Sequence, residues 1–241
     1  MHRSERLQSG YKAVKFVSHA TMLLALIFVM ALGSNSVVAD FESGRAAYEA
    51  GDFRGAREQW LSLAEAGDAN AQAALGSLHI HGEGVPVDFR EALKWMQLAA
   101  NQGDVTGQFN MGSMHAGGLG VEKNFGEAAR WFHLAAEQYD APSRFNLAIL
   151  YSRGRGVARN DIQAVYMYNT AAVIAGTPEI GLHDMAEEAE RMAIGMMITM
   201  DQAAIKEAHR RSKEFEQRYL KHYMAGYFER RRNGEILPQN P

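Results

Sequence analysis

The segment that decides the fold is Gly82-Glu83-Gly84-Val85. It recurs 36 residues later as GLGV at 118–121, and after a further 36 residues as GRGV at 154–157. Pairs of alanines at 99–100, 135–136 and 171–172 keep the same spacing. A period of this length is typical of stacked supersecondary units that share one continuous core. The sequence therefore predicts a repeat protein.

Each unit has the pattern of two helices. Residues 70–80 are rich in alanine, with apolar residues spaced three and four apart. Gly82 ends this helix, since glycine adopts the left-handed conformation without strain. Asp88, followed three positions later by Glu91, is a capping box that begins the second helix. We expect an all-α fold, an α/α solenoid of helical hairpins of about 36 residues each. Its units are 40–69 (partial), 70–104, 105–140 and 141–176.

Two residue types define the repeat structurally. Glycines break the chain between the two helices of a unit, and tryptophans on the second helix fill the gap between neighbouring hairpins. These repeat-defining residues are Gly82, Gly84, Trp95, Gly118, Gly120, Trp131, Gly154 and Gly156.

The repeat stops after Gly176, and residues 177–232 are predicted to form capping helices. Thr177-Pro178 is typical of a helix start. A methionine stripe that includes Met192 and Met196 is expected to pack against the last repeat. Thr199 with Gln202 forms a second capping box, and the helix it opens is basic and expected to fray after Gly226. Residues 233–241 are predicted to be a disordered tail.

Residues 1–39 have the pattern of a secretory signal peptide. A basic segment precedes the uncharged apolar run 20–32, and small residues precede Asp40. This run is shorter than the ~20 residues that span a bilayer as a helix. We therefore expect an exported protein, periplasmic or secreted, with an uncleaved inner-membrane anchor as the alternative.

Composition and motifs exclude several classes of function. The chain has no cysteine, which excludes disulfides, thiol catalysis and Cys-ligated metals. The net charge of −3 argues against nucleic acid as a partner. The G-x-G segments are not phosphate loops, because no strand precedes them and no Lys-Ser/Thr pair follows. With no catalytic motif in the sequence, we predict a protein that is not an enzyme and that uses no cofactor and no metal.

The repeated residues resemble the Sel1-like repeat family, a relative of tetratricopeptide repeats. The family pattern is Leu-Gly, an aromatic residue, G-x-G-V, an Asp or Asn cap, A-x-x-W, A-A and Gly. The first copy has Leu75-Gly76, His79, Gly82-x-Gly84-Val85, Asp88, Ala92-x-x-Trp95, Ala99-Ala100 and Gly103, and two further copies follow in step. The chain departs from the pattern at His79 and His115, where the family usually has tyrosine. These histidines form a metal site, a pH-sensitive patch, or hydrogen bonds to neighbours within the fold; we expect the last.

The resemblance implies a non-enzymatic scaffold or adaptor that binds a peptide segment or protein domain on its curved surface. By analogy with tetratricopeptide stacks, first-helix residues would line the concave side. The partner-binding candidates are Ser77, Ile80, His81, Ser113, Met114, Ser152 and Arg153. The expected partner is another protein of the bacterial cell envelope. The alternatives are an envelope enzyme or small-ligand-binding protein, and a membrane-tethered scaffold that keeps residues 1–39.

Overall fold

The computed structural model describes residues 40–178 and 180–232, and these residues form ten α-helices without a strand. The predictions for residues 1–39 and 233–241 lie outside the described residues. The helices are α2 (Phe41–Glu49), α3 (Phe53–Glu65), α4 (Ala69–His81), α5 (Phe89–Asn101), α6 (Val105–Gly117), α7 (Phe125–Glu137), α8 (Ala141–Arg153), α9 (Asp161–Ala175), α10 (His183–Met197) and α11 (Gln202–Arg232).

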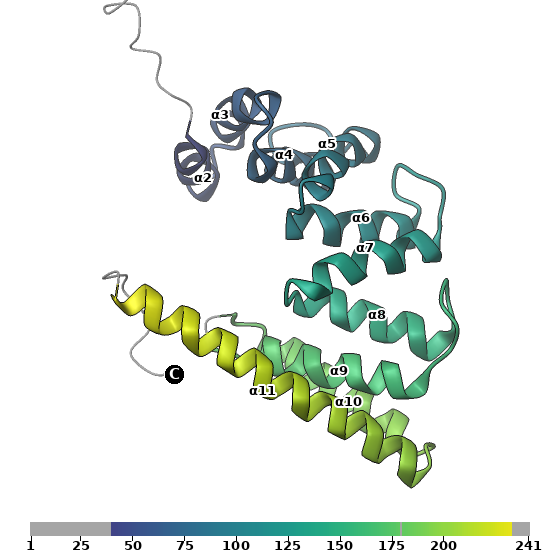
Figure 1. The fold of residues 1–241 in the computed structure, drawn as a ribbon. Coiled ribbons are helices and arrows are strands. Elements are labelled where there is room, and N and C mark those ends of the chain that lie inside the picture. The colour runs from purple at the N-terminus through teal and green to yellow at the C-terminus, as the bar shows by residue number, and fades with distance from the viewer. Residues whose placement is uncertain (1–39, 179, 233–241) are drawn as a thin grey trace, which may run out of the picture.

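Consecutive helices pair into hairpins, and the hairpins stack into a curved array (Figure 1). The all-α solenoid is therefore confirmed. α6 contacts α8 of the next hairpin, a closer approach than α5 makes to α7. The first helices α6 and α8 thus lie toward the inner side of the curve. Among the described residues, no helix combines the length and the apolar character needed to cross a membrane.

The breaks between helices follow the glycine pattern. Gly82, Gly118 and Gly154 end α4, α6 and α8 in the left-handed conformation, with φ of 73°, 75° and 61°. The second glycine of each segment allows a close approach between hairpins: a Cβ on Gly156 would lie 2.2 Å from the backbone carbon of Phe125. Both glycines of each G-x-G segment are therefore required, for different reasons.

The second helices begin at the expected caps. The side chain of Asp88 accepts hydrogen bonds from the backbone N–H groups of Arg90 and Glu91. Asn124 does the same for the start of α7, and Asn160 accepts from the N–H of Gln163 at the start of α9. These bonds satisfy donors that the helix itself leaves without partners.

The tryptophans pack between neighbouring hairpins, as predicted. Trp131 of α7 is 4% exposed and belongs to the core cluster of Met96 and Met111. Trp95 of α5 is half-buried and packs against the preceding cluster, which contains Trp60 and Leu75. Each tryptophan thus joins its own hairpin to the one before it.

The start of the C-terminal cap differs from the prediction. Thr177 does not begin a helix: its hydroxyl donates to the carbonyl of Ile174 and so closes the end of α9. Gly181, with φ of +67°, then turns the chain, and α10 begins only at His183. The expectation of a helix start at Thr177-Pro178 was wrong, because the threonine hydroxyl satisfies the preceding helix instead.

The rest of the cap follows the sequence more closely. Met192 and Met196 of α10 pack against the core of the last repeat, as expected. α11 begins at Gln202, but Asp201 is its cap, accepting from the N–H of Ala204 at 2.7 Å. The predicted fraying after Gly226 is not observed, since α11 continues through this residue to Arg232.

Candidate binding surfaces

The predicted partner-binding residues fall into three groups. His81 and Arg153 are exposed at the ends of α4 and α8. Ile80 is half-buried and packs against the core cluster that contains Trp131. Met114 is only 1% exposed and belongs to the same cluster, so it cannot line a surface. The prediction was wrong for Met114, because this position of α6 faces the neighbouring hairpin.

The three serines form the small, polar part of the inner surface. Ser77, Ser113 and Ser152 are half-buried. The hydroxyl of Ser77 donates to the carbonyl of Ala73, and that of Ser152 donates to the carbonyl of Ile149, each at 3.0 Å. The hydroxyl protons of Ser77 and Ser152 are therefore engaged by the helix backbone.

Two asparagines on the same helices were missed. Asn110 of α6 and Asn146 of α8 are 36 residues apart and half-buried. Each donates its side-chain N–H to the carbonyl four residues earlier, at 2.9 and 3.0 Å. This bond orients the amide and leaves its oxygen as an acceptor. The 36-residue spacing was the signal that could have found them.

His79 and His115 take equivalent places in α4 and α6. Their backbone carbonyls accept from the N–H groups of Asp88 and Asn124, at 3.0 and 2.9 Å. The Nδ1 atom of each ring is buried without a hydrogen-bond partner. The expected side-chain hydrogen bonds are thus absent at Nδ1. In residues 40–178 and 180–232, no three His, Asp or Glu side chains cluster in a way that could hold a metal ion.

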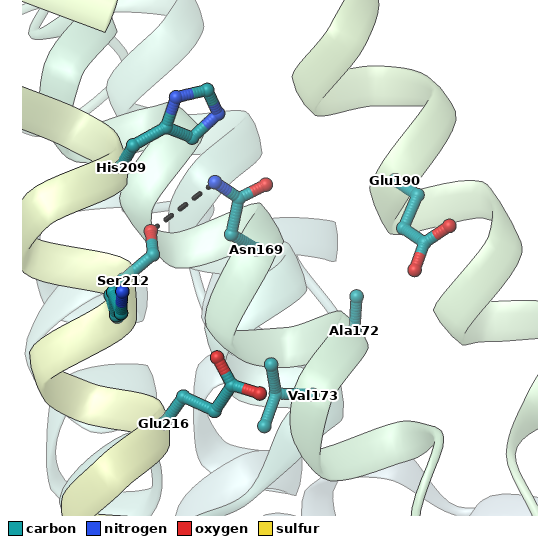
Figure 2. Close-up of a pocket in the computed structure, with 8 residues that line it drawn as sticks. Asn169, Ala172, Val173, Glu190, His209, Ser212 and Glu216 are labelled. Atoms are coloured by element: carbon teal, nitrogen blue, oxygen red, sulfur yellow. Dashed lines mark hydrogen bonds between the residues drawn. The ribbon is translucent and has the colours of Figure 1, made fainter. Parts of the chain in front are cut away.

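A second surface is the groove between α10 and α11, which both pack on α9 (Figure 2). One part has a volume of about 480 Å³, with Ala172 and Val173 of α9 as its apolar floor. Glu190 of α10 and Glu216 of α11 stand on its two walls. A second part, of about 370 Å³, shares Ala172, Val173 and Glu216 and extends to Pro178 and Leu220. We call this whole feature the α10–α11 groove.

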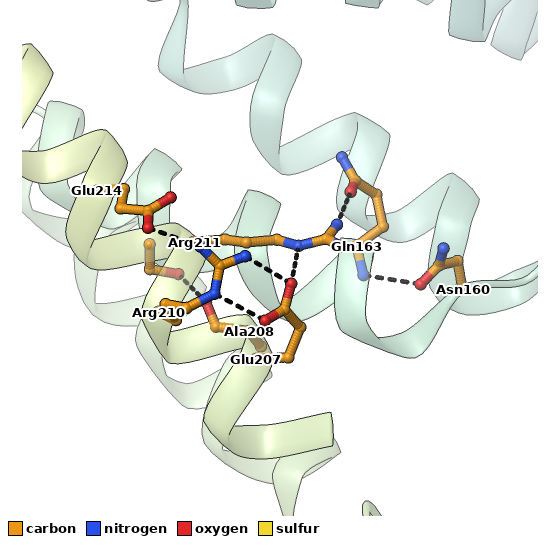
Figure 3. A network of polar contacts seen from close by, with 8 residues as sticks. Asn160, Gln163, Glu207, Ala208, Arg210, Arg211 and Glu214 are labelled. Carbon is orange, nitrogen blue, oxygen red and sulfur yellow. Dashed lines mark hydrogen bonds and ion pairs between the residues drawn. The ribbon is translucent and has the colours of Figure 1, made fainter. Parts of the chain in front are cut away.

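α11 is held at its start by a polar network (Figure 3). The carboxylate of Glu207 accepts from Arg210 and Arg211, each at 2.8 Å, and these hydrogen bonds lower its pKa to about 2. Arg211 also donates to the side chain of Gln163 on α9 at 3.4 Å. Two basic residues of α11, Arg210 and Arg211, are thus paired with a carboxylate within the fold.

Further along, α11 is held by a buried arginine. Arg144 of α8 is 6% exposed, and its guanidinium lies 4.2 Å from the ring centre of Phe215. It donates to the carbonyl of Ala136 at 2.7 Å and to the hydroxyl of Thr170 at 3.3 Å. Burial lowers the pKa of Arg144. Hydrogen bonds and an aromatic face, rather than a carboxylate, stabilise this charge.

The described residues thus form an α/α solenoid of helical hairpins that is closed at its C-terminal end by α10 and α11. Residues 69–104, 105–140 and 141–172 each match the Sel1 repeat. Three consecutive units of the chain are therefore Sel1 repeats.

Two solved structures are similar to the chain. One is a Sel1 repeat protein from Oxalobacter formigenes, 27% identical, with a TM-score of 0.55 over 68% of this chain and 72% of the other. The second is a protective antigen of uropathogenic Escherichia coli with an SLR fold, 28% identical, with a TM-score of 0.53. That match covers 76% of this chain but only 47% of the antigen. No curated protein sequence matches the chain.

Proposed function

We propose that the protein is a non-enzymatic scaffold of the bacterial cell envelope that binds a peptide segment or domain of another protein. Sel1 repeats generally mediate binding between proteins. The single observation that carries the proposal for this chain is its inner surface. There α6 and α8 present the half-buried side-chain amides of Asn110 and Asn146 at equivalent positions.

The asparagines give this surface a means of recognition. The free amide oxygens of Asn110 and Asn146 can accept backbone N–H groups of an extended segment. Ser113 lies one turn from Asn110 on the same face of α6. His81 and Arg153 add exposed donors at the edge. A repeated acceptor on a curved surface is suited to a peptide backbone, which repeats its donors in the same way.

An enzyme or small-ligand site has less support. Active sites usually gather groups of perturbed pKa in a cleft. The largest shifts among the described residues are those of Glu207 and Arg210, and both arise from ion pairs on the surface of α11. Neither residue lines the α10–α11 groove. These groups therefore stabilise a helix rather than prepare a reaction.

The envelope location rests on residues 1–39. A basic segment, an apolar run and small residues before Asp40 support export through a signal peptide. Mass spectrometry of the chain isolated from cells tests this directly. A chain that begins near Asp40 in the periplasmic fraction supports export, whereas an intact chain in the membrane fraction supports the tethered alternative. An intact chain in the cytoplasm would contradict both.

Binding is tested by crosslinked pulldown from envelope extracts, using the tagged chain and two matched variants. Asn110→Arg places a charge on the inner surface, and Leu134→Arg places the same charge on α7, where Leu134 is 36% exposed. We expect a reproducible partner that Asn110→Arg loses and Leu134→Arg keeps, with equal melting temperatures of the two variants. A partner retained by both variants would rule out the inner surface.

A further inference from the structure

The C-terminal end of α11 extends past the end of α9, on which the helix packs. α11 has 31 residues and α9 has 15, or about 46 Å against about 22 Å of helix axis. The two helices run in the same direction, because Arg211 contacts Gln163 near the start of α9 and Tyr219 contacts Thr177 just after its end. Beyond Tyr219, α11 continues past the end of α9 (Figure 1).

The sequence of this projecting end is basic. Leu220, at its base, is 43% exposed, and Lys221 and Ala225 are exposed as well. The last three residues of the helix are Arg230, Arg231 and Arg232. The base of this end contacts the rest of the fold, since His222 stacks on Tyr139, and an acidic, partly apolar surface would complement the basic residues beyond it.

The α10–α11 groove has that chemistry. Its floor of Ala172 and Val173 is apolar, and its walls carry Glu190 and Glu216. Neither carboxylate takes part in an ion pair within the described part of the chain. Lys213 and His209 also line the groove. However, α10 itself carries four carboxylates and a single arginine, which is paired with Glu188. The α10 wall is therefore acidic.

We propose that the α10–α11 groove is the docking site for the projecting end of α11 from a second copy of this chain. The two copies would exchange these ends around a two-fold axis, so that each groove is filled by the other copy's helix. Such an interface is self-complementary, because every contact is made twice. The proposal goes beyond the scaffold function, since it concerns the C-terminal cap and not the inner surface of the solenoid.

The lengths fit this arrangement. In two antiparallel α11 helices related by a two-fold axis beside Leu220, position 231 of one lies level with position 209 of the other. His209 lines the same part of the groove as Glu190. The arginines at the end of one copy therefore come level with the acidic wall of the other. The exposed Leu220 side chains of the two copies meet at this axis and form an apolar contact there.

Charge reversal tests the proposal on the full chain as it is isolated from cells. One variant has the groove reversed (Glu190→Arg with Glu216→Arg), and the second has the end reversed (Arg230→Glu, Arg231→Glu and Arg232→Glu). We expect the unaltered chain to sediment as a dimer and each variant alone to dimerise at least roughly tenfold more weakly, because each brings like charges together. Mixing the two variants should restore the dimer, since both exchanged contacts then join opposite charges.

Disulfide trapping tests the geometry, because the natural chain has no cysteine. A Glu190→Cys copy and an Arg231→Cys copy with different tags are mixed and oxidised. We expect a mixed disulfide from this pair and none when Lys94→Cys of α5, which is exposed, replaces Glu190→Cys. A monomeric unaltered chain, or a mixture of charge-reversed variants that stays monomeric, overturns the proposal. Binding of a basic segment of a different protein by a monomer would overturn it as well.

Discussion

The junctions between the inner repeats and the junction at the last repeat are held by the same hydrogen bond, but different residues donate it. Gln72, Gln108 and Arg144 are 36 residues apart, and each donates to the carbonyl eight residues earlier. In the first two, the glutamine also accepts from a second glutamine at the end of its hairpin, Gln102 or Gln138. Arg144 instead reaches Thr170 and the ring of Phe215. The shared hydrogen bond joins one hairpin to the next. The other contacts of the residue differ: in the inner repeats they are made with a glutamine, and in the last repeat with Thr170 and Phe215.

The chain turn before each junction shows the same contrast. Gly67 and Gly103 occupy this turn with φ of 100° and 92°, but the third turn has Tyr139 at φ of 65°. Its ring contacts Phe215, Tyr219 and His222 of α11. A non-glycine residue in this region costs about 1 kcal/mol or more. The last repeat therefore has a strained backbone at this turn, and the side chain of the strained residue, Tyr139, holds α11 in place.

Truncation of Phe215 should have the largest effect on the stability of the last junction. Phe215 is 4% exposed and contacts Arg144, Tyr139 and Tyr219. Phe215→Ala should lower the free energy of unfolding by about 3–5 kcal/mol, as buried aromatic truncations do. Urea denaturation measures it. The control Leu98→Ala on α5 removes a side chain that is 47% exposed and should cost less than about 1 kcal/mol; equal losses would show that Phe215 does not anchor the cap.

Two substitutions of Arg144 separate the shared bond from the cap contact. Arg144→Ala leaves the carbonyl of Ala136 without its buried donor, which should cost about 1–3 kcal/mol. Arg144→Gln gives the last junction the residue of the inner ones and should keep that bond. We therefore expect Arg144→Gln to be the milder change in chemical denaturation. If Gln were as harmful as Ala, the stacking on Phe215 would outweigh the hydrogen bond.

A tyrosine placed at an inner turn tests the backbone strain that Tyr139 carries at the last one. Gly103→Tyr places a tyrosine at an inner turn, where a Cβ would meet no atom within 4 Å and α11 is not present to contact the ring. We expect a loss of about 1–2 kcal/mol from backbone strain alone. Thermal unfolding of this variant provides the measurement. A neutral result would mean that the inner turns tolerate a side chain and that Tyr139 carries no strain.

Tyr139→Gly should have a smaller effect, since it relieves strain while it removes ring contacts. Aromatic pairs contribute about 0.5–1.5 kcal/mol each, so we expect a net loss of about 1 kcal/mol. In the Phe215→Ala background the loss should shrink or change sign, because part of the ring contact is already gone. The double-mutant cycle gives this coupling directly; additive effects would separate Tyr139 from the docking of α11.

The smallest effect should come from pH. The pKa of Glu207 is lowered to about 2 by its hydrogen bonds to Arg210 and Arg211, from an ordinary value of 4.5. A lowered folded-state pKa contributes stability above the ordinary value, and this is lost as the pH falls towards 2. Melting temperatures between pH 4.5 and 2 should therefore fall more for the unaltered chain than for Glu207→Gln. Because the pair is exposed, the difference should be small and should shrink in salt.

The sequence was most informative where one residue has one role. Gly82, Gly118 and Gly154 take the left-handed conformation, which glycine adopts without the strain of a Cβ, so their spacing alone predicted the helix ends. The sequence was least informative where the role depends on a distant neighbour. Thr177 has the pattern of a helix start, yet its hydroxyl closes the preceding helix and contacts Tyr219, 42 residues away.

The same distinction holds for the candidate surfaces. A repeat fixes which residues are equivalent, so the positions on α4, α6 and α8 followed from the 36-residue period. It does not fix which of them face the neighbouring hairpin, and therefore Met114 proved to be core while Asn110 lies on the partly exposed side of α6. The α10–α11 groove had no signature in the sequence, because it is lined from three helices that are brought together only by packing.

The sequence by itself determined the period, the helix ends and the order of the hairpins, because local backbone chemistry sets these features. Only the tertiary structure decided that Arg144 and Tyr139 contact Phe215 of α11, more than 70 residues further along the chain. It also placed Glu190 and Glu216 on opposite walls of one groove. Contacts of this range depend on how the last repeat curves and on where α11 lies on it, and no local pattern of residues encodes that geometry.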